Sequence, residues 1–314
     1  MLAAGAAPPG EDRLTGSRRA DACALTSART SEPLWGTAGA KPAWLLIEHA
    51  GPWPSDVLPA TLPGDVLEGV ATRAPDVRLA LIRRSGRQVV TRPKCLIART
   101  TGSGAPWLRE LELADYGEVL DLDLEAVQEG TQPGDGSARS EPVYLVCTHG
   151  RRDVCCAEFG RPVHRALDGA GHDVWEATHI GGDRFAASMI CFPHGFYYGH
   201  LNPVSAVAVA NSYRDGQIQL SNFRGRSGLA QPAQAAEHFV REATGCDGVG
   251  QVVADAATLV VTGTAAEVRV RAADQDFRVR LRARDHPGRV IGACGETEPA
   301  HRTVWWLQDL RATG

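Results

Sequence analysis

Apolar residues fall along this chain in short runs that alternate with helical spacing, and this alternation predicts an α/β protein. The run at 43–49 is continuous and stops at Gly51-Pro52. Such a run is typical of a strand that is buried on both faces and ended by residues that cannot extend a sheet. The elements expected up to residue 129 are strands at 43–49, 78–83 and 94–99, a helix at 66–73 and a short helix within 110–129.

A similar pattern starts again after a stretch rich in Gly, Pro and Ser at 130–141, which we interpret as a linker. A buried strand is followed there by a helix and further strands, an order that favours a βαβ unit with antiparallel additions. The elements expected are strands at 142–146, 173–178, 188–192, 251–261, 266–271, 277–282 and 303–307, a hairpin at 195–200, and helices at 156–167, 204–213 and 232–244.

The expected fold is therefore α/β, with a thioredoxin-like C-terminal domain packed on a smaller N-terminal α/β domain. That first domain is either a degenerate thioredoxin-like unit or a supporting layer. The expected boundaries are a disordered tail at 1–22, the N-terminal domain at 23–129, the linker at 130–141, and the thioredoxin-like domain with its β-rich extension at 142–314.

Charge and hydropathy exclude several functional classes. The formal net charge is -4, and no Lys/Arg run forms a basic groove, so nucleic acid is not an expected partner. No stretch reaches the roughly 18 apolar residues of a membrane span, and residues 1–19 lack the apolar core of a signal peptide. A cytoplasmic protein is expected. Arg replaces Lys almost everywhere and Ala and Gly are abundant, which is typical of a GC-rich bacterial genome.

Reactive side chains are concentrated in the segment 147–183. Cys147 ends a predicted strand, and Cys156 lies in the first turn of the following helix, where thiolates are favoured. His179 follows another strand, and Asp183 lies four positions further on. Two soft donors followed by an imidazole and a carboxylate form a plausible set of metal ligands.

Three chemistries fit these residues. A mixed Cys/His set suits an iron–sulfur cluster. Structural zinc is less favoured, because the chain has no Cys-x2-Cys or His-x3-His pair. An ordinary thioredoxin dithiol is absent, because Cys155 and Cys156 are adjacent. The residues therefore rank a cluster above zinc, and zinc above a dithiol.

The pattern Cys-x-His-x-x-Arg-Asp-x-x-Cys, followed by His-x-Gly-Gly-x-x-Phe, resembles the sucrase/ferredoxin-like family, a branch of thioredoxin-like ferredoxins. The matching positions are Cys147, His149, Arg152, Asp153 and Cys156, then His179, Gly181, Gly182 and Phe185. Further segments at 32–37, 44–48 and 193–199 extend the resemblance over most of the chain after Cys23. No paired-carboxylate site of glycosidase type is recognisable, so sucrase activity is not expected.

The resemblance implies a 2Fe–2S cluster held by Cys147, Cys156, His179 and a fourth ligand. Asp183 stands where the family's second His or Cys would be, and a carboxylate is a hard donor for such a cluster. The alternatives are that Cys155, Cys191 or His149 substitutes for it, or that the cluster has been lost. Asp153 is expected to cap the helix. The residues expected around the ligands are His149, Arg152, Cys155, Gly181 and Gly182.

The implied function is electron transfer to or from a redox partner protein, by a monomer or homodimer, without catalysis by the chain itself. The alternative is a thiol-based redox enzyme of thioredoxin descent that uses Cys147, Cys155 and Cys156. A zinc-bound structural protein is the third reading. The remaining cysteines (Cys23, Cys95, Cys191, Cys246 and Cys294) are expected to pack as small apolar side chains.

Overall fold

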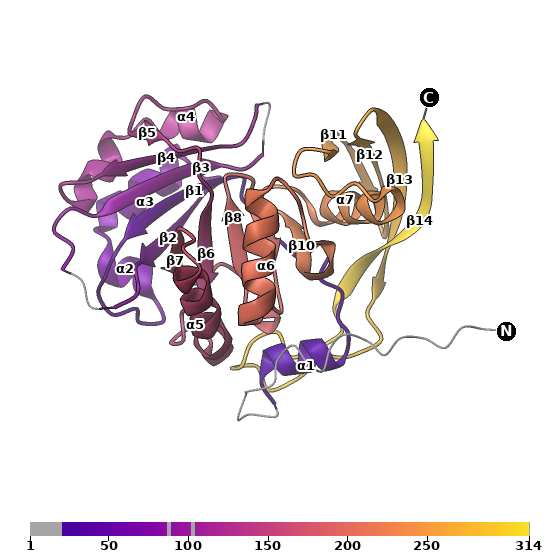
Figure 1. The fold of residues 1–314 in the computed structure, drawn as a ribbon, viewed down its shortest axis with the longest axis horizontal. Helices are drawn as coiled ribbons and strands as arrows, with labels where there is room; N and C mark the ends of the chain where they lie inside the picture. Colours follow the sequence, from indigo (N-terminus) through magenta and orange to yellow (C-terminus); the bar gives the residue numbers. More distant parts are fainter. Residues whose placement is uncertain (1–20, 87–88, 102–103, 314) are drawn as a thin grey trace.

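One mixed sheet of ten strands runs through the larger part of the molecule, and a separate four-stranded antiparallel sheet follows it (Figure 1). This computed structural model describes residues 21–86, 89–101 and 104–313. Most of the predicted N-terminal tail, residues 1–20, lies outside the described part. The α/β prediction is confirmed.

The first half of the large sheet has the strand order β2-β1-β3-β4-β5. β1 is parallel to β2 and antiparallel to β3, and β3 is antiparallel to β4. Helices connect β1 to β2 and follow β4. The elements are α1 (Cys23–Arg29), β1 (Ala43–Glu48), α2 (Val57–Thr61), α3 (Gly64–Arg73), β2 (Val77–Arg83), β3 (Lys94–Arg99), β4 (Trp107–Glu112), η1 (Tyr116–Asp121), α4 (Leu124–Glu129) and β5 (Ser137–Ala138).

The second half repeats this plan with the order β7-β6-β8-β9-β10. β6 is parallel to β7 and antiparallel to β8, and α5 connects the parallel pair. The same arrangement of a parallel strand pair with antiparallel additions thus occurs in both halves. The elements are β6 (Val143–Cys147), α5 (Val154–Gly169), β7 (Val174–Ala177), η2 (Asp183–Phe185), β8 (Met189–Phe192), β9 (Phe196–Tyr198), α6 (Pro203–Arg214), η3 (Leu220–Asn222) and β10 (Phe223–Arg226).

The two halves meet edge to edge through an antiparallel contact between β2 and β7. Ile82 is paired with Ala177 and Arg83 with Glu176, and the last pair also forms an ion pair of 2.7 Å between Nε and Oε2. The predicted linker, residues 130–141, therefore connects two halves of a continuous sheet. It also contains β5, and Arg139 bonds Glu110 of the first half and Asp173 of the second.

Side chains of each strand alternate between two cores. In β1, Leu45 and Ile47 pack under α2, α3 and α4, whereas Trp44 and Leu46 face the opposite side of the sheet. The core on that opposite side takes residues from both halves, which joins them into one packed body. Its second-half members include Val143, Leu145, Cys147, Trp175, Ile190, Phe192 and Tyr197.

The C-terminal part consists of helix α7 laid against the small sheet, with the order β11-β12-β13-β14 (Figure 1). The predicted antiparallel β-rich extension is confirmed. Its elements are α7 (Gln231–Thr244), β11 (Val252–Thr262), β12 (Ala265–Ala272), β13 (Gln275–Asp285) and β14 (Thr303–Thr313). None of the helices in the described part of the chain has the length and apolar content that crossing a bilayer requires.

Several elements were not predicted. α1 and α2 are short, β4 alternates apolar and charged residues and overlaps the start of the segment 110–129, and β10 lies in a segment for which no element was expected. β10 is buried along its whole length although its sequence is Phe-Arg-Gly-Arg. Its arginines are accommodated by hydrogen bonds to main-chain carbonyls, which local hydropathy does not reveal.

Candidate metal centre

The predicted ligands come from two loops at one edge of the sheet. Cys147 is the last residue of β6, and Cys156 lies in the first turn of α5. His179 follows β7 by two residues. Because β6 and β7 are parallel and Cys147 is in register with Ala177, the ends of both strands open on the same side. Asp153 caps α5 by accepting the main-chain N–H of Cys155 at 2.8 Å, as predicted.

These loops bring the sulfur atoms of Cys147 and Cys156 and a ring nitrogen of His179 within 4.8 Å of one another. Asp183 joins them from η2. Its Oδ1 lies 2.8 Å from Nδ1 of His179 and accepts a hydrogen bond of 3.2 Å from the thiol of Cys156. We call these four residues the central group. Both cysteines and Asp183 are buried, and 28% of the His179 side chain is exposed.

Hydrogen bonds within the central group shift the pKa values of all four residues. The hydrogen bond from Cys156, together with His179, lowers the pKa of Cys147 to about 5 despite its burial. The pKa of Cys156 is correspondingly raised, since its proton is held by Cys147. Burial alone would lower the pKa of His179, but Asp183 and Cys147 raise it to about 9. Burial would raise the pKa of Asp183, yet the bond to His179 lowers it.

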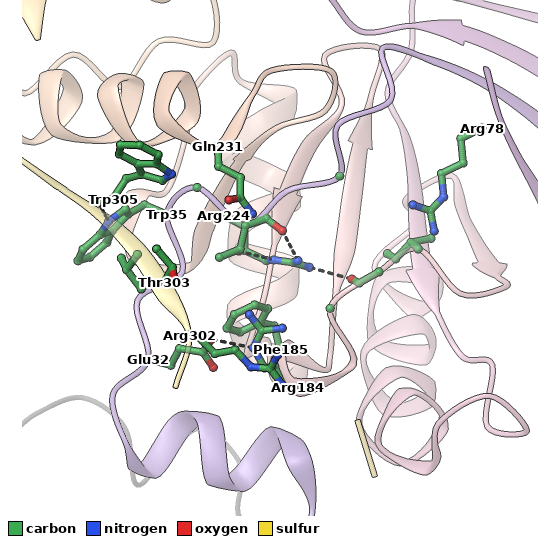
Figure 2. Close-up of a pocket in the computed structure, with 17 residues that line it drawn as sticks. Glu32, Trp35, Arg78, Arg184, Phe185, Arg224, Gln231, Arg302, Thr303 and Trp305 are labelled. Carbon is green, nitrogen blue, oxygen red and sulfur yellow. Dashed lines mark hydrogen bonds and ion pairs between the residues drawn. The ribbon is translucent and has the colours of Figure 1, made fainter. Parts of the chain in front are cut away.

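Arginine side chains hold the backbone of the His179 loop. Nη2 of Arg78, in β2, donates to the carbonyl of His179 at 2.7 Å. Nη1 of Arg224, in β10, donates to the carbonyl of Gly181 at 3.2 Å, and its Nη2 donates to Thr37 O at 2.6 Å. Figure 2 shows the Arg224 side chain among the residues that line a pocket, with dashed lines marking its hydrogen bonds. Among the described residues no carboxylate is hydrogen-bonded to this buried guanidinium, and burial lowers the pKa of Arg224 to about 10.

The glycine pair is required by this arrangement. Gly181 and Gly182 both have positive φ, +99° and +79°. A Cβ on Gly182 would lie 2.4 Å from Nη2 of Arg224. The group for which Gly182 makes room in this structure is therefore the Arg224 side chain. The same loop borders a pocket of about 190 Å³ that also contains Arg184, paired with Glu32 at 2.7 Å (Figure 2).

The other residues that the sequence placed near the ligands differ in how they contact the central group. Nε2 of His149 is 2.8 Å from the carbonyl oxygen of Pro54, and its main-chain N–H helps to lower the pKa of Cys147. The charge of Arg152 contributes to the lowered pKa of Asp183. Cys191 is buried in β8, where burial raises its pKa. Cys155 points away from the central group.

Cys155 instead meets two cysteines that we expected to be packing residues. Its sulfur lies 3.2 Å from that of Cys294, and Cys294 lies 3.5 Å from Cys23. Asp153 completes a second set of potential metal ligands among the described residues. No local motif predicts this set, because its members are distributed from Cys23 to Cys294. The available signal in the sequence was the number of cysteines that had no role besides packing.

A duplicated α/β sheet with a largely buried Cys–Cys–His–Asp group at the ends of two parallel strands defines an α/β protein with a potential metal-binding site. Comparison with known families gives the more specific assignment. Residues 34–225 match the sucrase/ferredoxin-like family, and the chain belongs to that family. The match includes both loops of the central group.

A curated relative is the altered inheritance of mitochondria protein 32 of Meyerozyma guilliermondii. It is 26% identical over 98 residues, which cover 27% of this chain and 35% of the relative. The matched region thus spans about a third of that relative's length. No solved structure matches the chain.

Proposed function

We propose that this protein is a ferredoxin-type electron carrier that holds a 2Fe–2S cluster with Cys147, Cys156, His179 and Asp183. The observation that supports the proposal most directly is the convergence of two thiols and an imidazole within 4.8 Å. Membership in the sucrase/ferredoxin-like family supports it further.

The donor set suits such a cluster. Cys147 and Cys156 come from one loop, and His179 and Asp183 from the other, so each loop offers a pair of ligands. Clusters in which two histidines replace two cysteines on one iron are a known variation. A carboxylate is harder than imidazole, but the contacts of Asp183 with both Cys156 and His179 support its choice as the fourth donor.

A bound cluster would supply one-electron transfer, while the protein orients the ligands and limits access of water. Arg78 and Arg224 fix the His179 loop through its carbonyl groups. His179 has the most exposed side chain of the four proposed ligands. We therefore expect a redox partner protein to approach the site from the side of His179. We expect the carrier to act in the cytoplasm, as a monomer or a homodimer.

The test is anaerobic purification of the full chain followed by analysis of iron and acid-labile sulfide, visible absorption, and EPR of the reduced protein. We expect equal amounts of iron and sulfide and an EPR signal that appears on reduction. Protein without iron or sulfide, even after reconstitution, would contradict the proposal.

Substitutions of Asp183 test the fourth ligand. Asp183→Ala should lower bound iron by about tenfold or more, because it removes a donor and leaves His179 without its partner. Asp183→His, which restores the His-x-x-x-His pattern of the family, should retain the cluster. Cys246→Ser, a partly exposed cysteine outside both ligand groups, is the control. Full iron content in Asp183→Ala would exclude Asp183 as a ligand.

A second candidate is a thiol-based redox protein, and the lowered pKa of Cys147 favours it. Cys156, whose thiol is hydrogen-bonded to Cys147, would then be the resolving cysteine, since Cys155 points away from the central group. The metal-free protein would show rapid alkylation of Cys147 and a reversible Cys147–Cys156 disulfide. Slow alkylation of Cys147 would exclude this function. Zinc at the central group, without sulfide, would instead indicate a zinc-bound structural protein.

A further inference from the structure

Three cysteines and an aspartate from distant parts of the chain converge on the side of α5 away from the central group. Cys23, Cys155, Cys294 and Asp153 each place one donor atom within 4.8 Å of all the others. Cys155 and Cys23 are fully buried, and Cys294 is partly exposed. We call these residues the outer group.

The outer group joins three segments that are far apart in the sequence and that also share a small apolar cluster. Cys23 is the first residue of α1, Cys155 lies in the first turn of α5, and Cys294 lies in the connection from β13 to β14. Cys23 and Cys294 are separated by 271 positions, yet their sulfur atoms are 3.5 Å apart. Packing alone does not require three thiols at one point, because any small apolar side chains would fill this space.

The spacing of the sulfur atoms suits coordination of one ion. Bonds of about 2.3 Å from a tetrahedral zinc ion place two sulfur ligands about 3.8 Å apart. The sulfur atoms of Cys155 and Cys294 are 3.2 Å apart, and those of Cys294 and Cys23 are 3.5 Å apart. Small outward movements of the side chains would therefore open a tetrahedral site.

Asp153 provides the fourth donor and fixes two of the others. Its Oδ1 accepts the main-chain N–H of Cys155 at 2.8 Å, and its Oδ2 accepts that of Cys294 at 2.6 Å. The thiol of Cys23 lies 3.7 Å from Oδ2. An ionised carboxylate has about four acceptor positions, so both oxygens can keep these bonds while one binds a metal ion.

We propose that Cys23, Cys155, Cys294 and Asp153 bind one zinc-class divalent ion that fastens α1 and the connection before β14 to the N-terminus of α5. Thiolate donors in a closed, largely buried set select such an ion. Each coordinating thiol releases its proton on binding. A disulfide is the competing use of these residues, but it would consume only two of the three sulfur atoms and leave the third thiol outside the bond.

The proposed ion is separate from the cluster of the proposed function. Cys155 and Cys156 are neighbours at the start of α5, and each turns to a different group. The helix thus presents one thiol to each site. The outer group would stabilise the helix end that also carries Cys156, without contributing a donor to the central group.

The first test uses the full-length wild-type protein. Metal analysis after anaerobic purification should give one zinc ion per chain. After removal of metal, titration with Co²⁺ alone should produce the strong visible bands of a tetrahedral thiolate site. Added Zn²⁺ should protect Cys23, Cys155 and Cys294 from alkylation, as mapped by mass spectrometry, while Cys246 remains reactive. Absence of binding, or a disulfide between any two of the three cysteines under these conditions, would overturn the proposal.

Variants separate the two sites. Cys155→Ala and Cys294→Ser should each lower bound zinc by about tenfold or more and leave iron and sulfide unchanged. Cys156→Ser should lower iron and leave zinc unchanged, and Cys246→Ser should alter neither. Zinc retained in both Cys155→Ala and Cys294→Ser would overturn the outer site. Absence of iron in every protein would contradict the proposed function alone.

Discussion

At the scale of single residues, side chains that fix the backbone near the central group are as informative as the proposed ligands. Gly182 has a positive φ and faces the Arg224 guanidinium, which is held by Gly181 and Thr37. A Cβ at this position would need both a strained backbone and displacement of a buried cation. The two requirements can be separated by comparison with another glycine.

We expect Gly182→Ala to lower the free energy of unfolding by about 3 kcal/mol, the sum of backbone strain and overpacking. The matched control is Gly245→Ala at the end of α7, where φ is +70° but nothing lies within 4 Å of a Cβ. That change should cost only about 1 kcal/mol. Urea unfolding of both variants measures the difference. Equal losses of unfolding free energy in the two variants would mean that the Arg224 side chain moves aside without an energetic cost.

At the scale of elements, α7 is packed against the small sheet through a nearly continuous buried surface that includes a histidine. His238 stacks on Trp35 with ring centroids 4.8 Å apart. Burial, assisted by the charge of Arg241, lowers the pKa of His238 to about 4. In the unfolded chain its pKa lies near 6.5, so the unfolded state binds the proton more readily.

The contribution of a neutral His238 is therefore fully present above about pH 6.5 and is lost as the pH falls towards 4. The largest slope for one proton is about 1.4 kcal/mol per pH unit. We expect His238→Gln to remove up to that slope from the stability profile measured by urea unfolding between pH 7 and about pH 4. Identical slopes in wild type and variant would show that His238 has the same pKa in the folded and the unfolded protein.

At the scale of the whole molecule, the duplicated halves share one core. Trp44 belongs to β1, yet its ring contacts Phe192 with centroids 5.6 Å apart, and its Nε1 donates to Ser227 Oγ at 3.1 Å. A core of this kind couples the stabilities of the segments that build it.

Trp44→Ala should lower the free energy of unfolding by about 4 kcal/mol. Because the core is shared, hydrogen exchange should accelerate to a similar extent in β3 of the first half and β8 of the second. Leu167→Ala serves as the comparison for these exchange rates, because Leu167 packs in the core formed by α5, α6 and the strands of the second half. Acceleration confined to β3 after Trp44→Ala would show that the two halves open independently.

The pattern of the sequence was sufficient for the α/β class, most strands of both sheets, the three long helices and the cap at Asp153. Long apolar runs and a capping carboxylate depend only on residues that are neighbours in the chain, so they can be recognised in the sequence without the structure. β4 and β10 were missed because charged residues interrupt them, and their burial depends on partners such as Glu110 with Arg139 and Arg226 with Val252.

The sequence by itself determined the family and supplied Cys147, Cys156, His179 and Asp183 as candidate ligands, because the two motifs that carry them are each short stretches of the chain. Only the tertiary structure decided that Asp183 contacts both His179 and Cys156, that Cys155 faces away from them, and that Cys23 and Cys294 meet it. The physical reason is that parallel strand ends and a shared helix terminus set these distances, and no local pattern of residues encodes them.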